Sequence, residues 1–211
     1  SMHSLNYFIG MTAITAFAMA GVLAAARKDM DIVSLTFLGV ITAVGGGTLR
    51  DLLMSTEVFW VIDFNYVWIA IAASILAFYL ERHLRDESVW ALILYLDAFG
   101  IALFGVQSID KALALNFSAP VAVVMATITG IGGGLIRDVL AQRPNLLLSR
   151  DIYATTIITG SIFYIALLGL SGKTALETLG GVAFTFVFRS LAIYWHWSMP
   201  KWMILRSNLN G

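Results

Sequence analysis

The sequence predicts an all-α membrane protein with about seven transmembrane helices, arranged as two inverted three-helix repeats followed by a seventh helix. The chain has 211 residues, of which 59% are hydrophobic and 12% are charged, and its mean hydropathy is +0.85. Apolar stretches of about 20 residues, the length that an α-helix needs to cross a bilayer, recur along the chain. A glycine-rich motif also occurs twice at a fixed spacing.

The composition excludes several classes of protein. A soluble domain carries roughly 25% charged residues, about twice the share found here. The formal net charge is zero and no basic tail is present, so we expect membrane lipid as a partner and no nucleic acid. Cysteine is absent, which excludes disulfides and thiolate metal sites. No metal-binding spacing or Ser/His/Asp pattern occurs, and we therefore expect no enzyme activity, catalytic residue or cofactor.

The expected spans form a single transmembrane domain over residues 1–211, in which repeat one covers about 5–83, repeat two about 89–170 and the seventh helix about 174–196. Each span is continuously apolar, whereas a barrel strand would alternate over about ten residues, so helices are predicted. The spans themselves are 5–26, 32–54, 66–80, 89–107, 119–140, 152–170 and 174–195.

The basic residues predict the orientation, because cytoplasmic loops carry an excess of Lys and Arg. With seven spans, one side of the membrane collects only Lys111 and Lys173. We therefore expect a multi-pass protein of the cell (inner) membrane with its N-terminus outside and its C-terminus in the cytoplasm. The opposite, basic side collects Arg27, Lys28, Arg82, Arg85, Arg143, Arg150, Lys201 and Arg206.

The glycine-rich motif reveals an internal duplication. Residues 45–52 (GGGTLRDL) recur as residues 132–139 (GGGLIRDV), a shift of 132 − 45 = 87 residues. Upstream, Gly21 and Gly105 match at a shift of 84. Because each copy holds an odd number of spans, the second copy must cross the membrane upside down relative to the first. Inverted repeats of this kind are typical of transporters, whose sites lie on interrupted helices near the bilayer midplane.

The two glycine runs predict a break or kink in the second and fifth spans. Each glycine costs about 1 kcal/mol of helix propensity relative to alanine. Carbonyl groups freed by a break are suitable ligands for a potassium or sodium ion. The alternative is close helix packing, since glycine lets two backbones approach. Because the runs occupy equivalent places in inverted repeats, we favour a solute path lined by Gly45, Gly46, Gly47, Gly132, Gly133 and Gly134.

An Arg-Asp pair follows each run, as Arg50-Asp51 and Arg137-Asp138, and the two pairs are expected toward opposite membrane faces. Neighbouring residues of a helix do not face each other, so we expect no ion pair within either dipeptide. One interpretation is a charged vestibule at each mouth, where the aspartates concentrate cations and the arginines hold the geometry. In the other, each arginine snorkels to the surface and each aspartate caps a loop.

Asp97 lies inside the fourth span, and its counterpart in the first repeat is Ala13. A carboxylate there is costly unless it is paired, hydrated or protonated, so we expect an arginine or a free amide as its partner. An interhelical hydrogen bond without a further role is the simpler interpretation. Arg189, in the seventh span, is expected to snorkel to the membrane surface.

Two segments resemble a known family: residues 96–104 (LDAFGIALF) and residues 130–140 (GIGGGLIRDVL). They are similar to a bacterial two-repeat membrane family, now often called the glycine transporter domain, which is similar in fold to the trimeric intracellular cation (TRIC) channels. The resemblance covers nearly the whole chain. It implies a homotrimer of seven-helix protomers, each with one path for monovalent cations, chiefly potassium, bounded by the second and fifth helices. The resemblance also places the glycine kinks and the Arg-Asp residues at the family's motif positions.

One segment departs from the family pattern, because residues 55–58 (STEV) stand where a basic residue and a proline are common, whereas the second repeat keeps Arg143-Pro144. The leading hypothesis is a passive potassium-permeable channel. The alternative is a carrier of glycine or another small neutral amino acid, in which Asp97 couples protons. A structural protein without a path is the third, and it predicts dry, tightly packed helices around both glycine runs.

Overall fold

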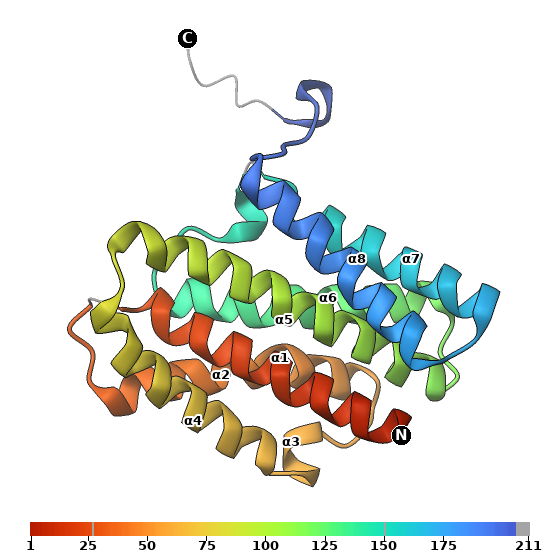
Figure 1. The fold of residues 1–211 in the computed structure, drawn as a ribbon, viewed down its shortest axis with the longest axis horizontal. Helices are drawn as coiled ribbons and strands as arrows, with labels where there is room; N and C mark the ends of the chain where they lie inside the picture. The colour runs from red at the N-terminus through yellow and green to blue at the C-terminus, as the bar shows by residue number, and fades with distance from the viewer. Residues whose placement is uncertain (27, 150, 206–211) are drawn as a thin grey trace.

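The computed structural model describes residues 1–26, 28–149 and 151–205, and these residues are mainly helical. Figure 1 shows α4 on one side of the α1–α5 pair and the α7–α8 pair on the other. The elements are α1 (Met2–Ala24), α2 (Ile32–Leu53), α3 (Phe59–Ile62), α4 (Asn65–Leu80), η1 (Glu81–His83), α5 (Asp86–Ala114), α6 (Ala119–Leu140), η2 (Leu146–Leu148), α7 (Ala154–Ser171), α8 (Ala175–Tyr194) and η3 (Lys201–Met203).

The structure confirms the all-α membrane fold. Among the described residues, six helices are long and apolar enough to cross a bilayer: α1, α2, α5, α6, α7 and α8. The remaining expected span is α4, which has 16 residues and continues directly into η1. Large apolar side chains such as Val33, Phe37 and Leu170 are more than 60% exposed on the outside of the bundle, as lipid-facing residues are.

The second repeat is inverted relative to the first. The C-terminal end of α2, at Arg50, borders a cavity that also includes Asn6 from the beginning of α1. The C-terminal end of α6 instead lies beside the end of α1, because the Arg143 guanidinium donates to the carbonyl of Ala24 and the Lys28 ammonium to that of Ala141. Helices α2 and α6 therefore run antiparallel, and the two Arg-Asp pairs lie at opposite ends of the bundle, as predicted.

Both glycine runs lie within uninterrupted helices, so the expected helix break is wrong. The glycines instead bring α2 and α6 into backbone contact. A Cβ atom added at Gly133 would lie 2.5 Å from the carbonyl oxygen of Thr42, and one added at Gly46 would lie closer still to that of Thr129. Thr42 and Thr129, like the two glycines, are 87 residues apart. The crossing of α2 and α6 therefore has the symmetry of the internal repeat. A bend that leaves the helices intact stays a prediction.

The helix ends repeat as well. After α2 and after α6, Ser55 and Gln142 have positive φ angles of 53° and 52°. The residue after each of these closes the same hydrogen-bonded turn at the helix end. The amide of Thr56 donates to the carbonyl of Asp51, and the amide of Arg143 donates to the carbonyl of Asp138. This arrangement is the usual way in which a helix satisfies its last carbonyl groups. It directs both following loops back across the ends of the bundle, where the charged residues lie.

The predicted orientation, with the N-terminus outside, stays a prediction. Three of the basic residues on which it depends, Arg27, Arg150 and Arg206, lie outside the described residues.

At the beginning of α2, Asp31 caps the helix by accepting from Val33 N at 2.9 Å and Ser34 N at 3.0 Å. The hydrogen bonds from Ser34 hold the pKa of this surface carboxyl below its usual value.

The glycine crossing predicts which small substitutions destabilise the protein. Gly46→Ala or Gly133→Ala places a methyl group against a backbone carbonyl that cannot rotate away, so we expect a loss of roughly 1–3 kcal/mol. Gly105→Ala is the matched control, because a Cβ atom there meets no atom within 4 Å. Thermal unfolding in detergent should show lower midpoints for the first two variants only. Equal midpoints for all three would contradict the backbone contact.

Candidate functional site: two buried charge clusters

The first charge cluster is centred on Arg50, and we call it the Arg50 cluster. The Arg50 Nε atom donates to Asp51 Oδ1 at 2.8 Å, and its Nη1 atom donates to Ser108 Oγ of α5 at 3.1 Å. The Lys111 ammonium, also on α5, donates to the same Asp51 oxygen at 2.8 Å. Arg50 and Asp51 are 2% and 0% exposed. The cluster thus joins α2 of the first repeat to α5 of the second.

The second cluster is centred on Arg137, and we call it the Arg137 cluster. The Arg137 Nε atom donates to Asp138 Oδ1 at 2.9 Å, and its Nη1 atom donates to Asp97 Oδ1 at 2.7 Å. The second Asp97 oxygen accepts from the Tyr153 hydroxyl at 2.9 Å. These side chains come from α5, α6 and the residue before α7, and Arg137 and Asp97 are both 0% exposed. The expectation of an arginine partner for Asp97 is confirmed.

The two aspartates of the repeated motif also fix the loops that follow them. Asp51 Oδ2 accepts from Phe59 N at 2.8 Å, and Asp138 Oδ2 accepts from Leu146 N at 3.2 Å. Each bond spans eight residues, so it is another feature of the repeat. Of the interpretation with snorkelling arginines and loop-capping aspartates, the part about the aspartates is confirmed.

Two expectations about the arginines are wrong. Each arginine does pair with the aspartate next to it, because its Nε atom lies partway along a flexible side chain that turns back toward the following residue. Neither arginine snorkels, since both are buried between helices and hydrogen-bonded there. Arg189 of α8 is also buried: it donates to the carbonyl of Ile152 at 2.9 Å and lies 4.8 Å from the ring centre of Tyr153.

A polar cavity of about 290 Å³ opens beside the first cluster, and we call it the Arg50 cavity. A second ion pair lies in its wall, because Lys173 contacts Asp110 at 3.1 Å and Asp110 also accepts from the Tyr164 hydroxyl at 2.6 Å. The cavity is lined by Asn6, Arg50, Phe59, Tyr66, Gln107, Asp110, Lys111, Ala114 and Lys173.

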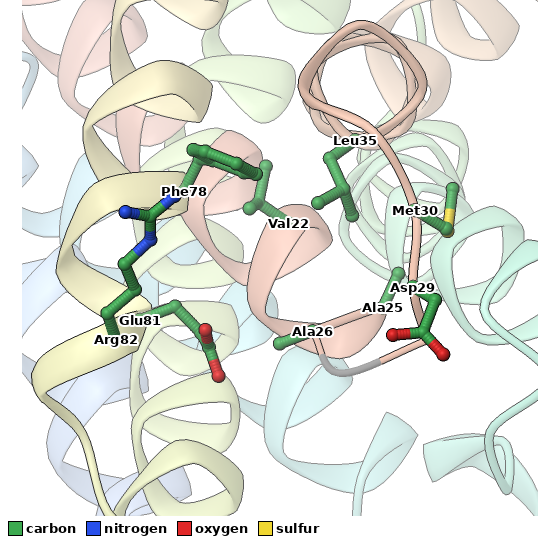
Figure 2. A pocket seen from close by; sticks show the side chains of 9 residues that line it. All are labelled: Val22, Ala25, Ala26, Asp29, Met30, Leu35, Phe78, Glu81 and Arg82. Atoms are coloured by element: carbon green, nitrogen blue, oxygen red, sulfur yellow. The ribbon is translucent and has the colours of Figure 1, made fainter.

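A smaller pocket of about 160 Å³ lies at the other end of α1, some 16 residues or about 24 Å from Asn6 along the helix. Figure 2 shows Glu81 and Arg82, after α4, on one side of it and Asp29, before α2, on the other. The Arg82 guanidinium lies 5.4 Å from the ring centre of Phe78. Both ends of the bundle therefore carry polar pockets.

Sequence reasoning identified the Arg-Asp pairs and Asp97 but missed several of their partners. Ser108 and Tyr153 gave no signal as single residues, since hydroxyl side chains are common in membrane helices. The internal repeat did carry a signal for Tyr153. Tyr66 and Tyr153 are 87 residues apart, so each follows its glycine-rich motif at the same distance. Lys111 was assigned only to a loop, whereas α5 extends to Ala114 and carries it into the cluster.

Comparison with known proteins places the chain in a family. A family profile described as "Glycine transporter" matches residues 7–82 and 94–168, one match in each repeat. A UPF0126 membrane protein of Vibrio cholerae is 39% identical over 96% of this chain and 85% of its own length. The UPF0126 inner membrane protein YadS of Escherichia coli is 38% identical over 95% of this chain and 97% of its own.

Two solved structures share the fold at high similarity. The TRIC trimeric intracellular cation channel orthologue from Rhodobacter sphaeroides has a TM-score of 0.86 and 31% identity, covering 92% of this chain and all of the other. A prokaryotic TRIC channel crystallised in 0.5 M KCl has a TM-score of 0.86 and 26% identity, covering 93% and 100%. This chain is therefore a multi-pass membrane protein of the UPF0126 (glycine transporter) family and a bacterial homologue of the TRIC cation channels, which are not enzymes.

Proposed function

We propose that the protein is a channel for monovalent cations, permeable to potassium, with one path in each protomer of a homotrimer and with residues 1–211 acting as one transmembrane unit. The observation that carries the proposal is the polar Arg50 cavity, which leads from one end of the bundle to buried charges. The high similarity to prokaryotic TRIC channels supports the choice of a cation as solute and of the trimer as assembly.

In this proposal α2 and α6 form the wall of the path, and the glycine runs act by allowing close approach. Carbonyl groups are not freed there, since both helices are uninterrupted. The two helices touch at Gly46 and Gly133, where an added Cβ atom would meet the backbone of the other helix. A cation would enter at the Arg50 cavity and pass the carboxylates of Asp51, Asp97 and Asp138. The arginines hold those carboxylates in place.

Tight packing around both glycine runs is also what a membrane protein without a path would show. The polar cavity supports the interpretation with a path. An apolar bundle has no reason to bury Asp110 and Arg50 beside open space, because each buried charge costs several kcal/mol before it is paired. Such groups in a membrane protein typically mark an ion or substrate pathway.

A carrier of glycine or another small neutral amino acid is the second candidate, and the description of the matching family profile favours it. The inverted repeat fits alternating access as well as it fits a channel. In a carrier, the ammonium and carboxylate groups of the substrate would meet the mixed charges of the Arg50 cavity, and Asp97 would couple protons.

One liposome preparation tests both functions. Purified protein is reconstituted, and potassium flux is followed with a fluorescent dye while uptake of labelled glycine is measured in parallel. We expect fast potassium flux without glycine accumulation. Slow, saturable glycine uptake that Asp97→Asn abolishes, without a potassium leak, would establish the carrier and reject the channel.

The charge of the cavity mouth predicts a salt-dependent change in flux. Lys173 lines the Arg50 cavity, its side chain is 47% exposed, and its ammonium neutralises Asp110 at 3.1 Å, so its removal leaves a net negative charge that attracts a cation. Lys173→Gln should raise potassium flux about two- to fivefold at low ionic strength, and the gain should shrink as salt screens the charge. Lys201→Gln is the control, because Lys201 is exposed and lies outside the cavity lining. Unchanged flux at low salt would show that cations do not enter here.

A further inference from the structure

The segment that follows α8 is rich in large apolar side chains. Residues 195–205 (WHWSMPKWMIL) contain three tryptophans, one lysine and no acidic residue. Near its end, Trp202 is 79% exposed, Met203 55% and Leu205 101%. In Figure 1 this segment, in blue, turns aside from the axis of α8 and projects from the bundle. The part of the chain that the structure describes therefore leaves these side chains uncovered.

The beginning of the segment is held in place. The carbonyl of Trp197 accepts a hydrogen bond from the amide of Ile152 at 2.9 Å, and Ser198 forms an antiparallel bridge with Asp151. The Trp197 ring stacks on the Trp195 ring, with 5.6 Å between the ring centres. The segment therefore leaves the bundle at a defined point, beside the loop that precedes α7.

That point lies where the helices leave the membrane. Helix α7 begins and α8 ends beside it, and both helices are long and apolar enough to cross a bilayer. Tryptophan concentrates at this depth in membrane proteins, because its ring is apolar and its indole nitrogen forms hydrogen bonds. A segment that turns aside here stays near the lipid headgroups, whereas one that continued along the axis of α8 would enter water.

We infer that residues 201–205, which we call the C-terminal anchor, bind the headgroup region of the phospholipid bilayer at the Arg137 end of the bundle. Their apolar side chains reach the boundary between headgroups and acyl chains, and the Lys201 ammonium meets lipid phosphates. The absence of acidic residues from 195–205 suits a negatively charged membrane surface. Through Trp197 and Ser198, the anchor fixes the loop before α7 relative to the membrane. This anchoring is independent of which solute the protein conducts.

The form of the anchor favours lipid over a second copy of the chain. Lys201, Trp202 and Met203 form a 3-10 turn, in which three residues complete one turn and so point in three directions. The surface of a neighbouring protomer would cover one of these directions and leave the others exposed. The headgroup region surrounds a segment and accepts an ammonium, an aromatic ring and an apolar chain together.

Fluorescence quenching tests the anchor. The chain contains no cysteine, so Leu205→Cys provides a single thiol for a fluorophore. The labelled protein is reconstituted in phosphatidylethanolamine–phosphatidylglycerol liposomes that carry a nitroxide either on the headgroup or near the methyl end of the acyl chain. We expect the headgroup nitroxide to quench about threefold more strongly than the deep one, because interfacial segments insert by about 5–10 Å. Iodide, a quencher dissolved in the water, should have little effect.

Two single-cysteine references calibrate the depth. Glu87→Cys marks the water at the same end of the bundle, since Glu87 is exposed at the beginning of α5, and iodide should quench its label strongly. Ile162→Cys marks the bilayer interior, since Ile162 is 57% exposed in the middle of α7, and the deep nitroxide should quench its label most. Trp202→Ser, added to Leu205→Cys, should raise iodide quenching about twofold, because it removes the largest interfacial side chain of the anchor.

The Leu205 label distinguishes three surroundings. Strongest quenching by the headgroup nitroxide supports the anchor. Iodide quenching equal to that at Glu87 shows a tail in water and overturns the anchor. Protection from iodide and from both nitroxides shows contact with protein, such as a second copy of the chain, and also overturns it. None of these measurements requires potassium flux, so failure of the channel leaves the test intact.

Discussion

The backbone contact between α2 and α6 is the constraint on which the rest of the structure depends. It places Gly46 of one helix against the carbonyl of Thr129 on the other, and Gly133 against that of Thr42. Residues four apart lie on the same face of a helix. Arg50 and Arg137, each four residues beyond one of these glycines, must therefore point into the bundle, one toward each end. Glycine and arginine belong to one motif because the first determines where the second lies.

Burial of the arginines sets the chemistry of everything around them. A guanidinium in the interior is tolerated only when it is paired and hydrogen-bonded, and loss of a partner costs several kcal/mol. Arg50 meets this need with Asp51 and the neutral Ser108, whereas Arg137 uses two carboxylates, Asp138 and Asp97. The aspartates then bind the amides of the following loops, so the loops at each end are held by the same charges that would border a cation path.

Much of this architecture is predictable from the sequence, because hydropathy and the 87-residue repeat determine the spans, their inversion and the opposite positions of the Arg-Asp pairs. The structure also confirms the arginine partner of Asp97. The helix break predicted from the low helix propensity of glycine was wrong, since packing of α6 against α2 outweighs the local cost of three glycines in a row. The snorkelling predicted for Arg50, Arg137 and Arg189 was wrong, because the position of a residue along a helix gives its depth in the membrane but not the face of the helix on which its side chain lies. Partners such as Tyr153 depend on tertiary contacts that no single segment contains.

A duplicated fold with a symmetric centre can still have unequal ends. The crossing at Gly46 and Gly133 obeys the repeat, and so do the helix caps at Ser55 and Gln142. Asp97 does not, and its carboxylate lies between Arg137 and Tyr153 without a counterpart at the other end. A change confined to that end leaves the backbone contact untouched, because the contact involves no charged group. The crossing that holds both repeats together is therefore symmetric, whereas the pairing of charges at the two ends is set by each end's own side chains.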